Sequence, residues 1–244
     1  MSSIAVGVSS IAVFCPVLGR REALRPMYES LVNASSVPWR LYLLCSPQDD
    51  DAEDVCLELE DADERVSCWT VDWKPEHADW AKKINYAYEE TAEDFLLLGA
   101  TDLRFHAEWD VAALRVAEEN GAGVIGTNDL GNATVMRGFH STHPLVRREY
   151  IDEHGTIDEE GKVLHEGYAH QWVDTELVET AKVRGAWAFA EHSRVEHLHP
   201  FWRKGRMDST YTKALSTSDE DHRYYAQRQR LWKLAAKRAR ISAS

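Results

Sequence analysis

The first half of the chain alternates short apolar runs with stretches of helical spacing, and this alternation limits the folds open to it. Apolar runs at residues 11–15, 41–45, 66–71 and 95–98 are typical of buried strands. Residues 22–32, 51–63 and 79–88 between them have the spacing of amphipathic helices, and we expect the first to begin near Pro26, since proline suits a first turn. This order predicts an α/β fold with a mostly parallel central sheet and helices on both faces.

The second half of the chain is less regular. Residues 109–119 have the spacing of a further helix, and residues 123–126 form a short apolar run typical of a strand. Histidine, tryptophan, glycine and tyrosine are scattered through residues 127–205, as in a layer of site-forming loops. Residues 221–239 are expected to form a helix. No linker or repeat interrupts the sequence, so we expect one domain over residues 1–244 with a loop-rich second half.

Composition and charge exclude several classes of protein. The net charge of −13 argues against a protein that wraps nucleic acid over its whole surface. The charge is uneven, since residues 49–64 carry ten acids and no base, and residues 223–240 carry seven bases and no acid. Four separated cysteines form no CxxC pair and suggest neither a zinc ribbon nor a disulfide scaffold, and Cys15 and Cys45, in apolar strand-like runs, are interpreted as small core residues. No apolar stretch is long enough to span a membrane. A cytoplasmic location is expected, because the N-terminus also lacks the basic region of a signal peptide.

An isolated acid follows the most apolar of these strands. Residues 95–98 lead through Gly99 to Asp102, which places this carboxylate at the end of a central strand, where open α/β sheets bind their ligands. A carboxylate there is costly without a partner, and a metal ion or a substrate cation is the usual one. The alternative is an aspartate that only caps the turn.

Histidines late in the chain are candidate companions of Asp102. In an extended segment, His197 and His199 point to the same side, so that one of them can complete a metal shell while the other bonds a phosphate. The alternative is a pair of ordinary surface histidines. A two-histidine zinc site is disfavoured, because no soft third ligand lies nearby in the sequence.

Other polar groups permit both a structural and a functional interpretation. Asp174 and Glu176 stand at an expected helix start, where the helix dipole stabilises acidic side chains, but either can also serve as a general base. Asn128 and Asp129 belong to a polar loop after a strand, either a turn or a substrate loop. Basic residues near strand ends are candidates to steady a diphosphate. They are Arg20, Arg21, Lys82 and Lys83.

Taken in order, these motifs resemble those of GT-A-fold glycosyltransferases, in particular the family 2 group that uses nucleotide sugars. The matching segments are Phe14-Cys15-Pro16 with Arg20, Ser46-Pro47-Gln48-Asp49, Lys82-Lys83-Ile84-Asn85, Ala100-Thr101-Asp102, Asp174-Thr175-Glu176, and His197 or His199. They extend over roughly residues 10–202, and Ala100 stands where the family has the first acid of its Asp-x-Asp motif. The resemblance implies a nucleotide-binding half at about residues 1–126, an acceptor and metal-completing half at 127–205, and a lid with a basic helix at 206–244.

The resemblance also implies the activity and the roles of the site residues. It implies a metal-dependent, inverting glycosyltransferase that uses Mn²⁺ or Mg²⁺ and a nucleotide sugar, with a UDP-sugar favoured. Asp102, His197 and His199 are then the metal ligands, and Asp174 or Glu176 is the catalytic base. The donor-binding residues are Pro16, Arg20, Ser46, Lys82, Asn85, Thr101 and Asp102, and the acceptor-binding residues are Asn128, Asp129 and Trp172. The acceptor stays open among a glycan, a protein and modified DNA.

Two other classes of function stay open at this point. A nucleotidyltransferase shares the sheet and the metal-bound acid, although the turn after the first strand has a single glycine where a triphosphate loop is glycine-rich. A binding module for nucleic acid or an acidic partner would instead use the basic C-terminal helix. Its cations are Arg223, Arg228, Arg230, Lys233, Lys237, Arg238 and Arg240. The aromatic residues of that helix, Tyr224, Tyr225 and Trp232, are expected to pack it onto the domain.

Overall fold

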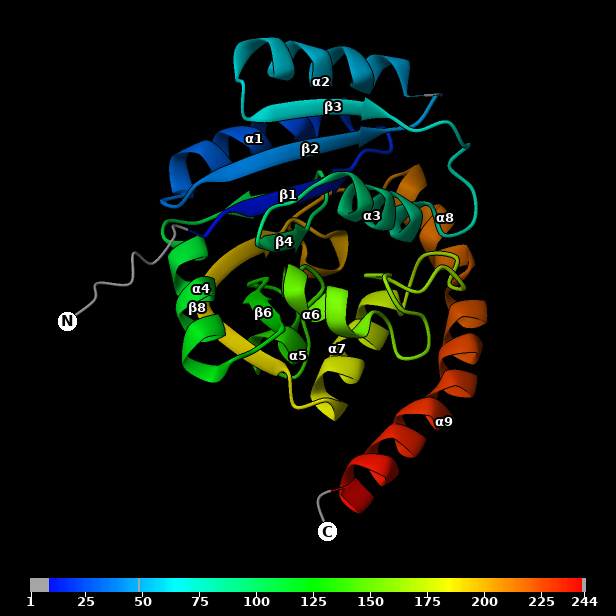
Figure 1. Cartoon of the computed structure of the whole chain (residues 1–244). Helices are drawn as coiled ribbons and strands as arrows, with labels where there is room; N and C mark the ends of the chain where they lie inside the picture. Colours follow the sequence, from blue (N-terminus) through cyan, green and yellow to red (C-terminus); the bar gives the residue numbers. More distant parts are fainter. Residues whose placement is uncertain (1–8, 48, 243–244) are drawn as a thin grey trace, which may run out of the picture.

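The structure of the protein is a computed structural model that describes residues 9–47 and 49–242. Its centre is an eight-stranded sheet of order β3-β2-β1-β4-β7-β6-β8-β5 (Figure 1). The strands are β1 Ile11–Pro16, β2 Trp39–Cys45, β3 Val66–Thr70, β4 Phe95–Leu98, β5 Leu103–Phe105, β6 Val124–Asn128, β7 Leu145–Arg147 and β8 Trp187–His197. β1 to β4 run parallel, and β6 runs parallel to β8. β7 is antiparallel to both of its neighbours, and β5 is antiparallel to β8. The predicted α/β fold with a mostly parallel sheet is confirmed.

Helices cover both faces of this sheet. They are α1 Arg21–Ala34, α2 Asp50–Ala62, α3 Asp79–Glu90, α4 Trp109–Asn120, α5 Ala133–Met136, α6 Arg148–His154, α7 Val173–Val183, α8 Ser209–Ser216 and α9 Ser218–Ser242, with a 3-10 turn η1 at Pro200–Trp202. One core lies under α1, α2 and α4, and the other under α3, α6, α7 and α9. Ile11 and Val13 point into the first core and Ala12 and Phe14 into the second, because successive strand residues face opposite sides.

The first helix differs from its expected start. α1 begins at Arg21, after Arg20 turns the chain with a φ of 58°. Pro26 therefore lies inside the helix, on its exposed side, and the expectation that the helix begins near Pro26 is wrong.

The C-terminal helix α9 is held to the body of the molecule by its aromatic side chains. Tyr225 and Trp232 are buried, and Trp232 Nε1 donates to Thr180 Oγ1 of α7 at 2.9 Å. The expectation that these aromatic residues pack the helix is confirmed. Arg228 is buried as well and pairs with Glu176, which removes it from any basic surface, whereas the side chains of Arg238 and Arg240 lie outside the described part.

Among residues 9–47 and 49–242, no helix is both long and apolar enough to cross a membrane.

Candidate functional site

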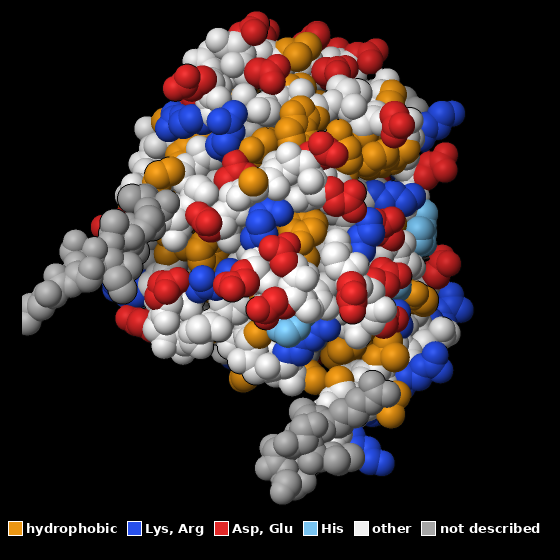
Figure 2. All heavy atoms as spheres, in the orientation of Figure 1, with side chains coloured by type: hydrophobic (Ala, Val, Ile, Leu, Met, Phe, Trp, Pro, Cys, Tyr) orange, Lys and Arg blue, Asp and Glu red, His pale blue; other side chains and the backbone are white. Residues whose placement is uncertain are grey.

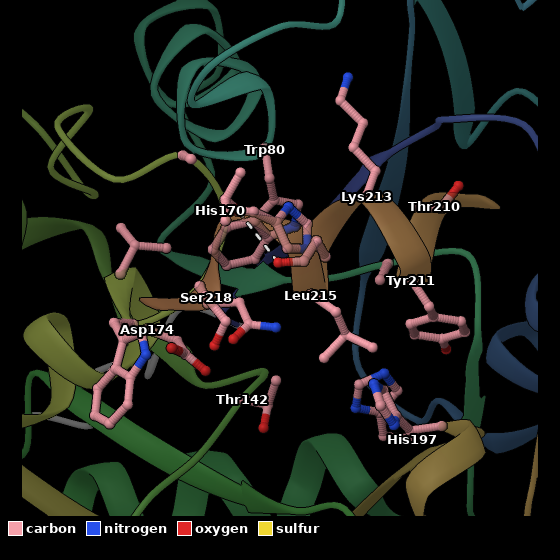
Figure 3. Close-up of a pocket in the computed structure, with 18 of the residues that line it drawn as sticks. Trp80, Thr142, His170, Asp174, His197, Thr210, Tyr211, Lys213, Leu215 and Ser218 are labelled. Carbon is pink, nitrogen blue, oxygen red and sulfur yellow. Dashed lines mark hydrogen bonds between the residues drawn. The ribbon is translucent and has the colours of Figure 1, made fainter. Parts of the chain in front are cut away.

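A cleft of about 960 Å³ opens where the carboxyl ends of β1 and β4 meet the loops of the second half (Figure 3). Its walls come from the ends of β1 and β4, residues 139–143, the start of α7, residues 197–202 after β8, and α8. Ligands of open α/β sheets bind at this end of the strands. The cleft therefore lies where the fold is able to present several loops to one ligand.

Asp102 stands in this cleft among three polar partners. Its Oδ2 accepts from Arg20 Nη1 at 2.9 Å and from the Tyr211 hydroxyl, and it lies 3.4 Å from His197 Nε2. Burial alone would raise the pKa of Asp102, but the hydrogen bond and charge of His197 and the charge of Arg20 outweigh it and hold the pKa well below the usual range. Its other oxygen, Oδ1, is buried and has no hydrogen-bond partner among the described residues.

Three imidazole rings are stacked edge to face beside Asp102. The ring of His197 lies 4.8 Å from that of His143 and 5.0 Å from that of His199. Burial, followed by the charge of His197, lowers the pKa of both His143 and His199 to about 4. Both rings are therefore neutral at physiological pH, and each keeps a lone pair on one nitrogen.

Hydrogen bonds decide which lone pairs are free for a metal ion. His143 Nδ1 faces the carbonyl of Leu98 at 2.8 Å, which assigns the proton to Nδ1 and leaves the lone pair on a buried, unpartnered Nε2. His199 Nδ1 instead accepts from the N–H of Phe201 at 3.1 Å, so the proton of the neutral ring lies on Nε2. His199 is thus better suited to donate to a phosphate than to ligate a metal.

A carboxylate oxygen and imidazole nitrogens are ligand types that suit a divalent ion such as Mn²⁺, but among the described residues these atoms do not form a group as compact as a preformed three-ligand site. Asp102 Oδ1 and His143 Nε2 are buried polar atoms whose bonding capacity is unused, and His197 lies within contact distance of the same carboxylate. Carboxylate with imidazole suits Mn²⁺ better than Mg²⁺, which prefers oxygen ligands and commonly takes the rest of its shell from substrate phosphates.

A second charged pair lies across the cleft, at the start of α7. Asp174 Oδ2 is 3.2 Å from His140 Nε2, and Asp174 lies opposite His197 and Tyr211 in Figure 3. Burial would raise the pKa of Asp174, but the charge and hydrogen bond of His140 lower it below its usual value. Burial lowers and Asp174 raises the pKa of His140, with a net increase. Asp174 is therefore ionised and able to accept a proton.

Asp208, the residue before α8, and Tyr211, in its first turn, are linked to Asp102. Arg20 pairs through Nε with Asp208 Oδ2 at 2.6 Å, and its guanidinium carbon lies 4.0 Å from the centre of the Tyr211 ring. Tyr211 in turn donates to Asp102. One arginine and one tyrosine thus tie the C-terminal segment to the acid at the end of β4.

Many residues that the sequence analysis assigned to the site line this cleft, although their roles remain a prediction. They are Pro16, Arg20, Thr101, Asp102, Trp172, Asp174, His197 and His199. They come from β1, the turn after β4, α7 and the end of β8, so residues nearly 200 positions apart meet in one cleft.

Three of the expected donor-binding residues do not line the cleft. The Asn85 amide donates to the carbonyl of Leu164, and its oxygen accepts two N–H groups of the same loop, so it fixes that loop. Ser46 is fully buried and bonds to Lys83 Nζ at 2.7 Å. Lys82 does not line the cleft either. The cation of α3 that points into the protein is its neighbour Lys83, which is buried and pairs with Asp79. Gln48, which belongs with Ser46 to the expected donor loop, lies outside the described residues.

The expected acceptor loop and the second candidate base also have structural roles. Asn128 Oδ1 and Asp129 Oδ1 accept backbone N–H groups of residues 130–132 and thereby shape that turn. Glu176 points away from the cleft, with both oxygens bonded to Arg228 and one of them to the Tyr168 hydroxyl. Glu176 is 2% exposed and has both oxygens bonded, so it offers no free carboxylate oxygen to a substrate in the cleft.

Four residues of the site were not singled out from the sequence. His140 and His143 lie on the irregular segment between α5 and β7, where their residue type was the available signal. Asp208 and Tyr211 reach the site from the C-terminal segment, and nothing in the sequence pairs them with Arg20 or Asp102.

Comparison with solved structures identifies the fold as that of GT-A glycosyltransferases. A mannosyltransferase from Pyrobaculum calidifontis in complex with GDP-Man and Mn²⁺ aligns with a TM-score of 0.60 and 11% identity over 77% of this chain and 56% of its own. TarS from S. aureus, residues 1–349 in complex with UDP, gives a TM-score of 0.60 at 10% identity over 76% and 59%. Glucosyl-3-phosphoglycerate synthase from Mycobacterium tuberculosis, with Mn²⁺, UDP-glucose and phosphoglyceric acid, gives 0.56 at 14% identity over 78% and 71%.

The present chain therefore spans less than two thirds of the first two of these relatives. No protein-family model matches it, and no curated protein matches it either. The expectation of a GT-A fold is confirmed by structural likeness alone.

Proposed function

We propose that the chain transfers a sugar from a nucleoside diphosphate sugar to an acceptor hydroxyl, with a divalent metal ion bound at Asp102. The observation that carries this proposal is the unpartnered, buried Oδ1 of Asp102 in a cleft at the strand ends of a GT-A fold. Structures of similar fold contain Mn²⁺ with GDP-Man or with UDP-glucose, which supports a nucleotide sugar as the ligand class. A UDP-sugar is the first donor to test.

The metal is proposed to be held by Asp102 with His197 and His143, and the donor phosphates would fill the other positions. When bound, the ion would neutralise the negative charge that develops on the leaving diphosphate. His199 would donate from Nε2 to a phosphate oxygen, because its Nδ1 is already used by the backbone. The expected role of His199 as a metal ligand thereby becomes one of positioning the donor.

Arg20 is proposed to contribute a second positive charge to the diphosphate. Its guanidinium bonds Asp102 and Asp208, and its side chain is only 14% exposed, so it is already largely desolvated within the cleft. A charge in such a place interacts with a phosphate more strongly than a solvated one. We expect the contacts to Asp208 and Tyr211 to loosen as the donor and metal enter.

Asp174 is proposed as the general base that takes the proton of the acceptor hydroxyl. It lines the cleft across from His197 and Tyr211 (Figure 3), and its pairing with His140 lowers its pKa and keeps it ionised. Attack from that side, opposite the leaving diphosphate, would invert the anomeric centre. Trp172, which precedes Asp174 and also lines the cleft, offers an aromatic face to a sugar or another acceptor.

No separate nucleic-acid function is proposed. Among the described side chains of α9, the exposed cations are Arg223, Arg230, Lys233 and Lys237, while its aromatic residues and Arg228 face the protein. This arrangement lacks the exposed aromatic surface on which bases stack.

The proposal is tested by thermal unfolding with UDP-, GDP-, dTDP- and CMP-sugars, each with and without Mn²⁺. We expect one nucleotide to raise the melting temperature only in the presence of Mn²⁺, because the ion joins the phosphates to Asp102. A melting temperature that no combination changes would contradict the proposal. Stabilisation by a free nucleoside triphosphate in preference to every sugar nucleotide would instead favour a nucleotidyltransferase.

A further inference from the structure

Three cysteines far apart in the sequence meet on the α2 side of the sheet. Cys45 ends β2, Cys68 lies in the middle of β3, and Cys56 comes from the inner face of α2. Cys45 Sγ is 3.5 Å from Cys56 Sγ and 3.9 Å from Cys68 Sγ, and all three sulfur atoms lie within 4.8 Å of one another. Within the described part of the chain, no other group of three metal-ligating side chains is this compact.

The apolar runs around Cys15 and Cys45 predict small core residues, and Cys15, which lies outside the cluster, fits that prediction. Cys15 is fully buried in β1, and burial raises its pKa far above the usual value, as in an inert structural thiol. Cys68 differs, because it lies only half-buried on the edge strand β3. The cluster therefore has one side that is partly open to solvent.

The sulfur spacing matches that of a thiolate-bound metal ion. A metal–sulfur bond of about 2.3 Å gives sulfur–sulfur separations of about 3.8 Å in a tetrahedral shell and about 4.0 Å in a trigonal one. The observed 3.5 and 3.9 Å lie close to both. The described residues can thus hold an ion on three sulfurs with small side-chain adjustments.

The surroundings of the cluster favour a cation. α2, which covers it, carries acidic residues on its outer face, visible as the red spheres at the top of the molecule in Figure 2. Glu60 Oε1 accepts the N–H of Cys68 at 3.0 Å, which fixes the backbone that presents one of the sulfurs. Negative charge near a thiolate cluster raises the local concentration of cations and offsets the charge of a bound ion.

We propose that Cys45, Cys56 and Cys68 form a site for a thiophilic d¹⁰ metal ion such as Zn²⁺ or Cu⁺, separate from the cleft at Asp102. The ion would join β2, α2 and β3 and thereby stabilise this edge of the sheet. Soft thiolate ligands select such ions over Mn²⁺ and Mg²⁺, so the two sites would take different metals. The proposal does not depend on the glycosyltransferase function.

The test uses the full chain kept reduced by a phosphine, with Cd²⁺ as a spectroscopic probe and Zn²⁺ in competition with a chromophoric chelator. We expect one Cd²⁺ per chain with a sulfur-to-metal charge-transfer band, and a rise in melting temperature with Zn²⁺. Cys68→Ala, at a half-buried position where the fold tolerates a small side chain, should abolish the band and weaken Zn²⁺ binding by at least about 100-fold.

Cys15→Ala is the matched control, since it removes a buried thiol outside the cluster. This variant should keep the band and the Zn²⁺ affinity of the wild type. Absence of a charge-transfer band in the wild type, or a band unchanged by Cys68→Ala, would overturn the proposal. A Cys45–Cys56 disulfide in the isolated protein without metal uptake after reduction would overturn it too, in favour of a redox pair.

Discussion

Two carboxylates of this protein have nearly the same set of partners, yet only one of them lies in the cleft. Asp102 and Glu176 are each bonded by an arginine that also pairs with a further carboxylate, and each accepts from a tyrosine hydroxyl. The two sets are Asp102 with Arg20, Asp208 and Tyr211, and Glu176 with Arg228, Asp158 and Tyr168. The partners alone therefore do not separate a functional acid from a structural one.

The difference lies in what is left unbonded. Glu176 has both oxygens bonded and is 2% exposed, whereas Asp102 lines the cleft together with three imidazoles and has an Oδ1 that is buried without a partner. Buried polar atoms are almost always bonded, so an unbonded one next to a cavity points to a missing ligand. The fully bonded network of Glu176 holds α7 and α9 together, whereas the incompletely bonded network of Asp102 is suited to bind a ligand.

Asp102→Asn should have the largest effect on turnover, and it tests the functional half of this comparison. We expect sugar transfer to fall on the order of 10³-fold, because the charge that holds the metal is lost. The protein should stay folded, since Arg20 keeps Asp208 as a partner, but its melting temperature should fall because the carboxylate charge that His197 and Arg20 stabilise is lost. Initial rates with Mn²⁺ and the best donor measure this, and turnover within tenfold of the wild type would remove Asp102 from the metal site.

Asp174→Asn should lower kcat by about 10²- to 10⁴-fold with donor affinity nearly unchanged, as expected for loss of a general base.

His140→Gln supplies a test through the pH dependence of kcat. The charge of His140 lowers the pKa of Asp174, so its removal should raise that pKa and move the acid limb of the kcat profile to higher pH. An acid limb that stays in place in His140→Gln would show that a different group is the base.

Arg228→Met tests the structural half of the comparison. It leaves Glu176 buried without its cation, and we expect the free energy of unfolding to fall by about 3–5 kcal/mol. Turnover per folded molecule should stay within threefold, because neither residue lines the cleft. Urea unfolding and active-site-normalised rates measure the two effects. A loss of turnover without a loss of stability would reverse the assignment.

The two tyrosines give the smallest and most specific contrast. Tyr211→Phe removes a bond that competes with ligands of Asp102, so the apparent affinity for Mn²⁺ should rise a few-fold. Tyr168→Phe should instead lower stability by about 1–3 kcal/mol, because Glu176 loses a buried donor, and leave the Mn²⁺ affinity unchanged. Equal Mn²⁺ affinities in Tyr211→Phe and the wild type would mean that the Tyr211 bond does not restrict the site.

The sequence was informative about strands and less so about which side a polar residue faces. Apolar runs such as residues 95–98 predicted the central strands, and the GT-A resemblance predicted a fold that the structural comparison confirms. Lys82 and Lys83 show the limit, because adjacent helix residues point about 100° apart and only the packing of α3 reveals which is buried. In the same way, only the contact with Arg228, 52 positions further along the chain, shows that Glu176 is bonded within the protein while Asp174 lines the cleft.

Long-range pairing was the other limit. Tyr211 lies 109 positions from Asp102, on a segment whose place over the cleft follows from tertiary packing. The cysteine cluster is similar, since Cys45, Cys56 and Cys68 have no metal-site spacing in the sequence and meet only because α2 folds across β2 and β3.

The most direct test of the Asp102 site is Mn²⁺ binding measured by the electron paramagnetic resonance of the free ion, with saturating nucleotide. The wild type, Asp102→Asn and Glu176→Gln form a matched set, because each variant neutralises one of the two arginine-paired carboxylates. We expect one Mn²⁺ per chain in the wild type and in folded Glu176→Gln, and at least about a tenfold loss of affinity in Asp102→Asn. Equal Mn²⁺ binding by Asp102→Asn and the wild type would contradict a metal site at Asp102.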